Sequence, residues 1–95
     1  LSFNGKTTSA SSNVATYIYC GDDSVTPVSG RILLYQNGKQ IKEKKIENIE
    51  TGVSGDVYYY TQVDWRDLEG GFDQYQLKAE ITDNYGRVYS SEFFQ

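Results

Sequence analysis

Alternation of apolar and polar side chains with a period of two most limits what this chain can fold into. It is cleanest over residues 75–82, where the apolar positions are Tyr75, Leu77, Ala79 and Ile81. Successive side chains of a β-strand point to opposite faces of the sheet, so such a segment presents one apolar face. Residues 14–20 and 57–65 alternate in the same way, and helical spacing is nearly absent. The pattern predicts an all-β fold.

Turn signals separate these segments at intervals typical of a small sandwich or barrel. Asn37-Gly38 follows the strand predicted over 31–36 and favours the two positive φ angles of a type I′ hairpin turn. The lysine-rich segment 39–46 is its predicted partner, and lysines protect an edge strand from unwanted pairing. A last strand is predicted over 87–94, and a short first strand over 1–3 or 6–10. We therefore expect about seven strands.

Length and charge limit the number of domains and the kind of partner. A chain of 95 residues is expected to form one domain over 1–95. Nine basic residues and a net charge of −4 argue against a nucleic-acid partner, because phosphate binding needs clustered Lys and Arg. No apolar run approaches the ~20 residues that span a bilayer, so we expect no membrane insertion. Because the chain begins at Leu1 instead of Met, we expect it to be a piece of a longer protein.

Ordinary catalytic constellations need side chains that this sequence lacks. It has no histidine, so it offers no Ser–His or Cys–His pair and no imidazole metal ligand. Cys20, the single cysteine, lies on the apolar face of the strand predicted over 14–20. A buried structural thiol is expected there, because a reactive cysteine needs exposure and a nearby positive charge. We therefore expect no enzymatic activity, no internal disulfide and no organic cofactor.

Three segments carry a resemblance to a known family. They are 14–23, a strand closing on Gly-Asp-Asp, 32–38, a strand running into Asn-Gly, and 75–86, a strand with its following turn. In these segments the chain resembles a bacterial immunoglobulin-like module, of the kind strung in tandem along secreted and cell-surface proteins. The resemblance implies an immunoglobulin-like Greek-key β-sandwich of about seven strands without a disulfide. It also implies an extracellular or cell-surface location as part of a longer secreted protein.

Three structural positions follow from the resemblance. Tyr75 stands two residues before the core position Leu77, where such folds place a tyrosine corner. Its hydroxyl would bond to backbone in residues 68–72. The paired core cysteines of antibody domains are missing, because Cys20 is alone and Leu77 stands where its partner would be. Trp65, the only tryptophan, ends the strand predicted over 57–65 instead of lying in the third strand.

The implied topology also brings several acidic turns to one end of the domain. These turns contain Asp22, Asp23, Asp56, Asp83 and Asn84. Calcium takes about six to eight oxygen ligands, so a calcium apex built from Asp22, Asp23 and Asp83 is one interpretation. The other is that Asp and Asn stand there because their side chains stabilise turns. Both stay open at this stage.

Four tyrosines are predicted to share the outer face of one sheet. Tyr17 and Tyr19 point outward if Ile18 faces the core, and Tyr58 and Tyr60 point outward if Tyr59 does. The resemblance makes their two strands neighbours. Such a face can stabilise the sheet through cross-strand pairs, contact a neighbouring domain or another protein, or stack on sugar rings.

A smaller outward pair is expected on the opposite sheet, where polar residues would surround it. It consists of Leu33 and Tyr35, with Gln76, Lys78 and Glu80 as neighbours.

Our functional hypothesis is a non-catalytic accessory module of a larger extracellular protein that serves as a spacer, docks on a neighbouring domain or contacts a partner. The alternative is a carbohydrate-binding or adhesin domain that uses the outward face formed by Tyr17, Tyr19, Tyr58 and Tyr60.

Overall fold

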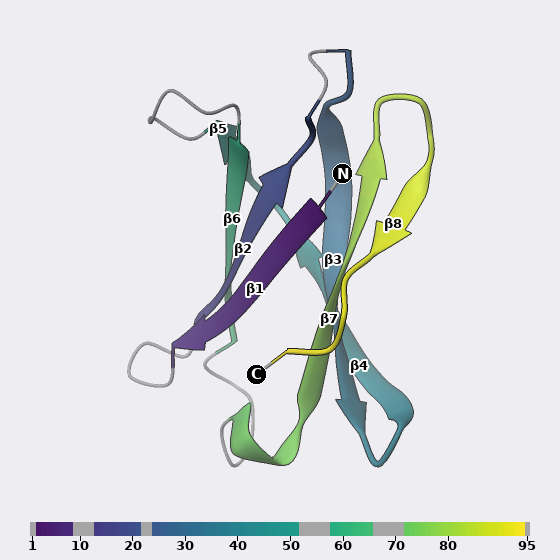
Figure 1. Ribbon diagram of the computed structural model, residues 1–95. Coiled ribbons are helices and arrows are strands. Elements are labelled where there is room, and N and C mark those ends of the chain that lie inside the picture. The colour runs from purple at the N-terminus through teal and green to yellow at the C-terminus, as the bar shows by residue number, and fades with distance from the viewer. Residues whose placement is uncertain (1, 9–12, 22–23, 52–57, 66–71, 95) are drawn as a thin grey trace.

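The computed structural model describes residues 2–8, 13–21, 24–51, 58–65 and 72–94, and shows two antiparallel sheets that face each other (Figure 1). The elements are β1 (Ser2–Thr8), β2 (Asn13–Tyr19), β3 (Pro27–Gln36), β4 (Lys39–Ile46), β5 (Ile49–Thr51), β6 (Tyr58–Asp64), the 3-10 helix η1 (Phe72–Gln74), β7 (Gln76–Asp83) and β8 (Val88–Ser90). One four-stranded sheet has the order β1-β2-β6-β5, and the other has the order β4-β3-β7-β8. The predicted all-β class is confirmed, and the arrangement is consistent with a β-sandwich.

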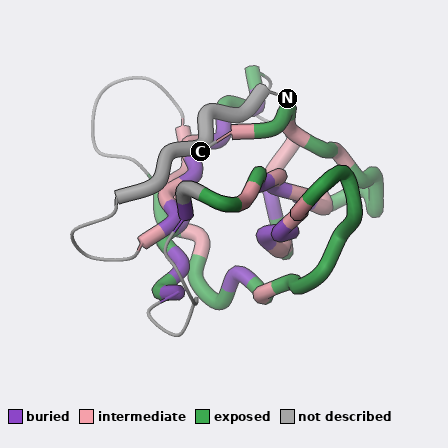
Figure 2. The backbone as a smooth tube through the Cα atoms, turned by 90° about the horizontal axis from the view of Figure 1, so that it is seen from below, coloured by how far each residue is buried: buried purple, intermediate pink, exposed green. Residues whose placement is uncertain are grey.

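The hydrophobic core lies between the two sheets and follows the alternation in the sequence. Buried positions recur at every second residue of β2 and β7, so each strand contributes one side of its pleat (Figure 2). The fully buried apolar residues are Val14, Ile18, Ile32, Leu34, Leu77, Ala79 and Ile81. Trp65 and the free thiol of Cys20 also belong to this core. The buried positions expected for Leu77 and Cys20 are therefore confirmed, and Trp65 is buried as well.

The strands predicted from alternation begin and end within about one residue of their predicted bounds. β2 and β6 pair antiparallel along their whole length, from Asn13 opposite Asp64 to Tyr19 opposite Tyr58. The hairpin turn between β3 and β4 is also confirmed, because Asn37 has φ 53° and Gly38 has φ 78°. This turn leaves the lysine-rich β4 at an edge of its sheet, as its composition predicts.

The structure corrects the bounds of β3 and adds a strand. The sequence predicts the start of β3 near residue 31, but β3 begins at Pro27. Proline is tolerated there because it is the first residue of the strand. A register shift between Pro27 and Ser29 leaves Val28 unpaired and exposed. The three-residue strand β5, which pairs with β6, was not predicted. Its short sequence, Ile49–Thr51, is too brief to show a period.

The last strand is shorter than predicted. β8 ends at Ser90. At the next position the Ser91 N–H still donates to the Ala79 carbonyl at 2.8 Å, but the Ala79 N–H donates to the side-chain Oγ of Ser91, also at 2.8 Å, and not to a backbone carbonyl. A further antiparallel bridge joins Leu77 and Phe94, where the Phe94 N–H donates to the Leu77 carbonyl at 2.9 Å. Phe94 packs against the core, and its neighbour Phe93 is exposed.

Candidate functional site

Tyr19, Tyr58, Tyr17 and Tyr60 form a zigzag of rings on the outer face of the β1-β2-β6-β5 sheet. The pairing of β2 with β6 sets Tyr17 opposite Tyr60 and Tyr19 opposite Tyr58. Ring centroids are 5.8 Å apart for Tyr19 and Tyr58, 6.1 Å for Tyr58 and Tyr17, and 5.2 Å for Tyr17 and Tyr60. We call these four residues the tyrosine face. Their predicted juxtaposition is confirmed.

The rings of the tyrosine face are tilted against one another and do not form a flat platform. The interplanar angles are 41° for Tyr19 and Tyr58, 51° for Tyr17 and Tyr58, and 53° for Tyr17 and Tyr60. Only Tyr19 is exposed, at 41%, and the other three rings are partly buried against one another. Such tilted packing contributes to the sheet and leaves a ridged amphipathic surface. A ridged surface suits an irregular protein contact better than a planar polysaccharide.

The end of the tyrosine face next to β5 is electrostatically distinct. Glu50 of β5 lies opposite Tyr60 in the β5–β6 pairing. Burial raises the pKa of Tyr60, and the neighbouring Tyr17 and Glu50 raise it further. A hollow of about 180 Å³ lies here, lined by Asn48, Glu50, Tyr60 and Gln62. The sequence did not identify this hollow, because β5 itself gave no recognisable strand pattern.

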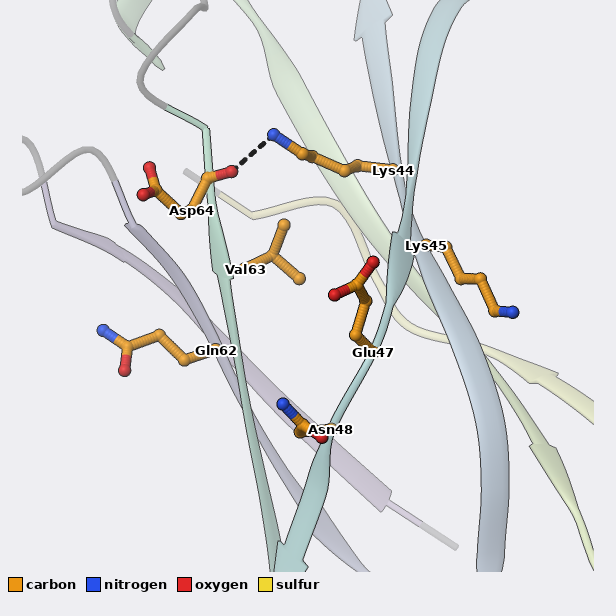
Figure 3. Close-up of a pocket in the computed structure, with 7 residues that line it drawn as sticks. All are labelled: Lys44, Lys45, Glu47, Asn48, Gln62, Val63 and Asp64. Carbon is orange, nitrogen blue, oxygen red and sulfur yellow. Dashed lines mark hydrogen bonds between the residues drawn. The ribbon is translucent and has the colours of Figure 1, made fainter.

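A larger cleft of about 520 Å³ continues from that hollow, between the edge of β4 and β6 (Figure 3). Its lining residues are Lys44, Lys45, Glu47, Asn48, Gln62, Val63 and Asp64. Lys44 Nζ donates to the Asp64 carbonyl at 2.6 Å and lies 5.8 Å from the centre of the Trp65 ring. The Lys45 side chain extends away from the cleft in Figure 3. Lys44 therefore crosses the end of the cleft next to Asp64, and Lys45 points away from the cleft.

The opposite sheet carries a second aromatic cluster on its outer face. The Tyr35 and Phe93 rings meet edge-on with centroids 5.1 Å apart, and Lys78 Nζ lies 4.6 Å from the Phe93 centroid. Leu33 is only 4% exposed, although it faces outward, because it lies between Lys78 and Glu43 of the neighbouring strands. The expected pair of Leu33 and Tyr35 is present. Phe93 was missed, and the Phe93-Phe94 doublet at the end of the chain was the available signal.

Asp83 is buried and fully engaged by neighbouring donors. Its Oδ1 accepts the N–H groups of Tyr85 and Arg87, each at 2.9 Å, and its Oδ2 accepts Arg87 Nε at 2.8 Å and the Tyr89 hydroxyl at 3.0 Å. Burial alone would raise the pKa of Asp83, but the hydrogen bonds from Arg87, Tyr89 and Tyr85 outweigh it and lower the pKa to about 2. In this structure Asp83 therefore stabilises the turn between β7 and β8 through its hydrogen bonds.

Two of the turns predicted to meet at this end of the domain lie within the described residues, and they are in contact. Asn84 accepts the Thr26 N–H on Oδ1 at 2.8 Å, and its Nδ2 donates to the Ser24 carbonyl at 2.9 Å. The predicted ligands Asp22 and Asp23, together with Asp56, lie outside the described residues, so the calcium apex stays a prediction. Among the residues that the structure describes, no group of three or more His, Cys, Asp or Glu could hold a metal ion.

Tyr75 lies between η1 and β7 and packs, partly buried, against the core. Its N–H donates to the Phe72 carbonyl at 3.0 Å, which closes the turn into β7. The tyrosine-corner bond predicted for its hydroxyl involves residues 68–72, of which 68–71 lie outside the described residues, so that bond stays a prediction. No helix in the described ranges is long and apolar enough to cross a membrane.

Comparisons of the chain with protein-family models, curated proteins and solved structures found no match.

Proposed function

We propose that this chain is a non-catalytic, immunoglobulin-like interaction module of a larger extracellular protein, and that it contacts a neighbouring domain or another protein through the tyrosine face. The observation that carries the proposal is the zigzag of Tyr19, Tyr58, Tyr17 and Tyr60 on the outer face of a sheet. Tyrosine is enriched where protein surfaces meet, because its ring is apolar while its hydroxyl tolerates water.

The strand order supports the immunoglobulin-like part of the proposal. If the eight strands are lettered A, B, C, C′, D, E, F and G in chain order, one sheet contains A, B, E and D and the other contains C′, C, F and G. Constant-type immunoglobulin domains place A, B, E and D in one sheet and C, F and G in the other. The chain also changes sheet after β2, β4 and β6, as a Greek-key sandwich requires.

The first experiment concerns the parent protein. The complete gene is sequenced, and the domains that it encodes beside this one are produced separately. Binding of this domain to each of them, and to itself, is measured by isothermal titration calorimetry and sedimentation. A gene that encodes only these residues, or measurements that detect no association, would remove the proposal of a docking module.

Variants then test whether the tyrosine face is the contact. Tyr19→Ser and Tyr58→Ser are expected to weaken the association by ~10-fold or more, because a few central aromatic side chains dominate most interfaces. Tyr85→Ser is the matched control, since Tyr85 is 61% exposed and lies in the turn between β7 and β8. Equal affinity of Tyr19→Ser, Tyr58→Ser and the original chain would place the contact elsewhere.

The alternative is a carbohydrate-binding or adhesin domain, favoured by the exposed ring of Tyr19 and its neighbours. Tilted rings suit a short, bent oligosaccharide better than a flat polysaccharide chain. A glycan array, repeated with Tyr17→Ala and Tyr58→Ala, separates the two functions. Glycan binding that both substitutions abolish would favour the alternative, whereas no glycan binding would leave the protein contact.

A further inference from the structure

The hollow beside Glu50 has the size of a site for one side chain. It measures about 180 Å³ and is lined by Asn48, Glu50, Tyr60 and Gln62. Pockets that hold a whole small molecule measure about 300–1,000 Å³, so this hollow is too small for one. It lies at the end of the tyrosine face, where the Tyr60 ring contacts Tyr17 at 5.2 Å. A partner that covers the tyrosine face would therefore reach it.

The charge around the hollow favours a cation. Within the described part of the chain, no ion pair engages Glu50, whereas Glu43 and Glu80 are both paired with Arg31. The lining offers a carboxylate, two side-chain amide oxygens and an aromatic ring, all of which attract positive charge. The net charge of the chain, −4, acts in the same direction.

The adjoining cleft gives a partner chain room to pass. The hollow and the 520 Å³ cleft share the lining residues Asn48 and Gln62, so they adjoin each other along β6. Glu47 lines the cleft and adds a second carboxylate, while Lys44 is held by the Asp64 carbonyl (Figure 3). Two carboxylates, Glu50 in the hollow and Glu47 in the cleft, are therefore available to a cation that a partner places here.

We infer that this hollow receives an arginine side chain of a protein partner that docks on the tyrosine face. The inference rests on the proposed function, because it names the partner's chemistry at one edge of the same face. A guanidinium is planar, so it can stack on the Tyr60 ring while it donates two parallel hydrogen bonds to the Glu50 carboxylate. Its remaining N–H groups match the amide oxygens of Asn48 and Gln62. A neutral glycan carries no such cation.

The test is a titration of the 95-residue chain, labelled with ¹⁵N, with N-acetyl-arginine amide, followed by NMR. Saturable shifts are expected at Asn48, Glu50, Tyr60 and Gln62, with a dissociation constant in the ~millimolar range expected for one exposed charge and one ring. N-acetyl-citrulline amide has the same shape without the charge and is expected to leave these signals unchanged. Equal shifts with citrulline, or no saturable shifts with arginine, would overturn the inference.

Variants separate this site from nonspecific attraction. Glu50→Gln is expected to weaken arginine binding by ~5-fold or more, and Tyr60→Leu to weaken it while Tyr60→Phe retains it. Glu92→Gln, which removes an exposed carboxylate elsewhere, is the control for net charge. If Glu50→Gln binds arginine as the original chain does, the inference is wrong. If Tyr19→Ser weakens partner binding but Glu50→Gln does not, only the arginine inference fails and the docking proposal stands.

Discussion

Thr16 of β2 and Thr61 of β6 stand directly opposite each other in the core, and neither hydroxyl has a hydrogen-bond partner among the described residues. Their exposed fractions are 0% and 1%. A buried hydroxyl without a partner costs roughly 1–3 kcal/mol, because it has given up its hydrogen bonds to water. The pair is therefore a weak point inside an otherwise apolar core.

Replacing either threonine by valine is expected to stabilise the domain. Thr61→Val and Thr16→Val each keep the branched shape and remove the unpaired hydroxyl, so each should raise the free energy of unfolding by about 1 kcal/mol. Urea denaturation followed by fluorescence measures the change. Thr51→Val on the exposed part of β5 is the control and should have little effect. A loss of stability in both core variants would mean that a buried water bonds to the hydroxyls.

Gly30 is required by close packing between β3 and β7. A Cβ at this position would lie 2.8 Å from the Glu80 carbonyl oxygen and 2.6 Å from Ile81 Cδ1. Gly30→Ala should therefore lower the free energy of unfolding by about 1–3 kcal/mol. Ile81→Val in the same chain removes Cδ1 but leaves the backbone contact, so it should restore stability only in part. Ser29→Ala is the neighbouring control. A Gly30→Ala variant with unchanged stability in urea denaturation would contradict the packing.

Asp83 should make the stability of the domain depend on acid pH. Its folded pKa of about 2 lies below the ordinary value of 3.8, so the charged carboxylate is preferred in the folded state. This stabilisation is fully present above the ordinary pKa and is lost as pH falls from about 4 toward 2. Melting temperatures measured across this range should fall more steeply for the original chain than for Asp83→Asn. Parallel curves for the two chains would contradict the low folded pKa of Asp83. Glu92→Gln is the control for loss of a carboxylate.

Much of the tyrosine face could be predicted from the sequence. Alternation places Tyr17 and Tyr19 on the face opposite Ile18, because the strand pleat has a fixed period of two. Bringing them beside Tyr58 and Tyr60 needed the order of strands in the sheet, which came from the resemblance. The tilt between the rings could not be predicted from the sequence, since it depends on side-chain rotamers and on neighbours from the other strand.

The hollow beside Glu50 could not be predicted for a different reason. β5 contains only Ile49, Glu50 and Thr51, and three residues cannot show a period. Its position is set by pairing with β6, which is a tertiary contact. Asp83 illustrates the same limit, because its partners Arg87 and Tyr89 are close in sequence but their bonds depend on the turn geometry.

Cys20 should react with thiol reagents only when the domain unfolds. Its side chain lies in the core, with 7% of the residue exposed, and burial raises the pKa of its thiol, so little reactive thiolate is available. In native buffer near pH 8, modification by Ellman's reagent should be at least ~10-fold slower than for free cysteine. The reaction should become complete in denaturing urea. Rapid modification of the folded domain would show that Cys20 is accessible.

Tyr17 should contribute to stability through its ring and not through its hydroxyl. Its ring contacts two other rings of the tyrosine face, Tyr58 at 6.1 Å and Tyr60 at 5.2 Å. Aromatic pairs contribute roughly 0.5–1.5 kcal/mol each, so Tyr17→Ala should lower the free energy of unfolding by about 1–3 kcal/mol. Tyr17→Phe keeps both ring contacts and should change it little. Urea denaturation of both variants, with Tyr85→Ala as the exposed control, distinguishes the contributions. If Tyr17→Phe were as destabilised as Tyr17→Ala, the hydroxyl and not the ring packing would hold the face together.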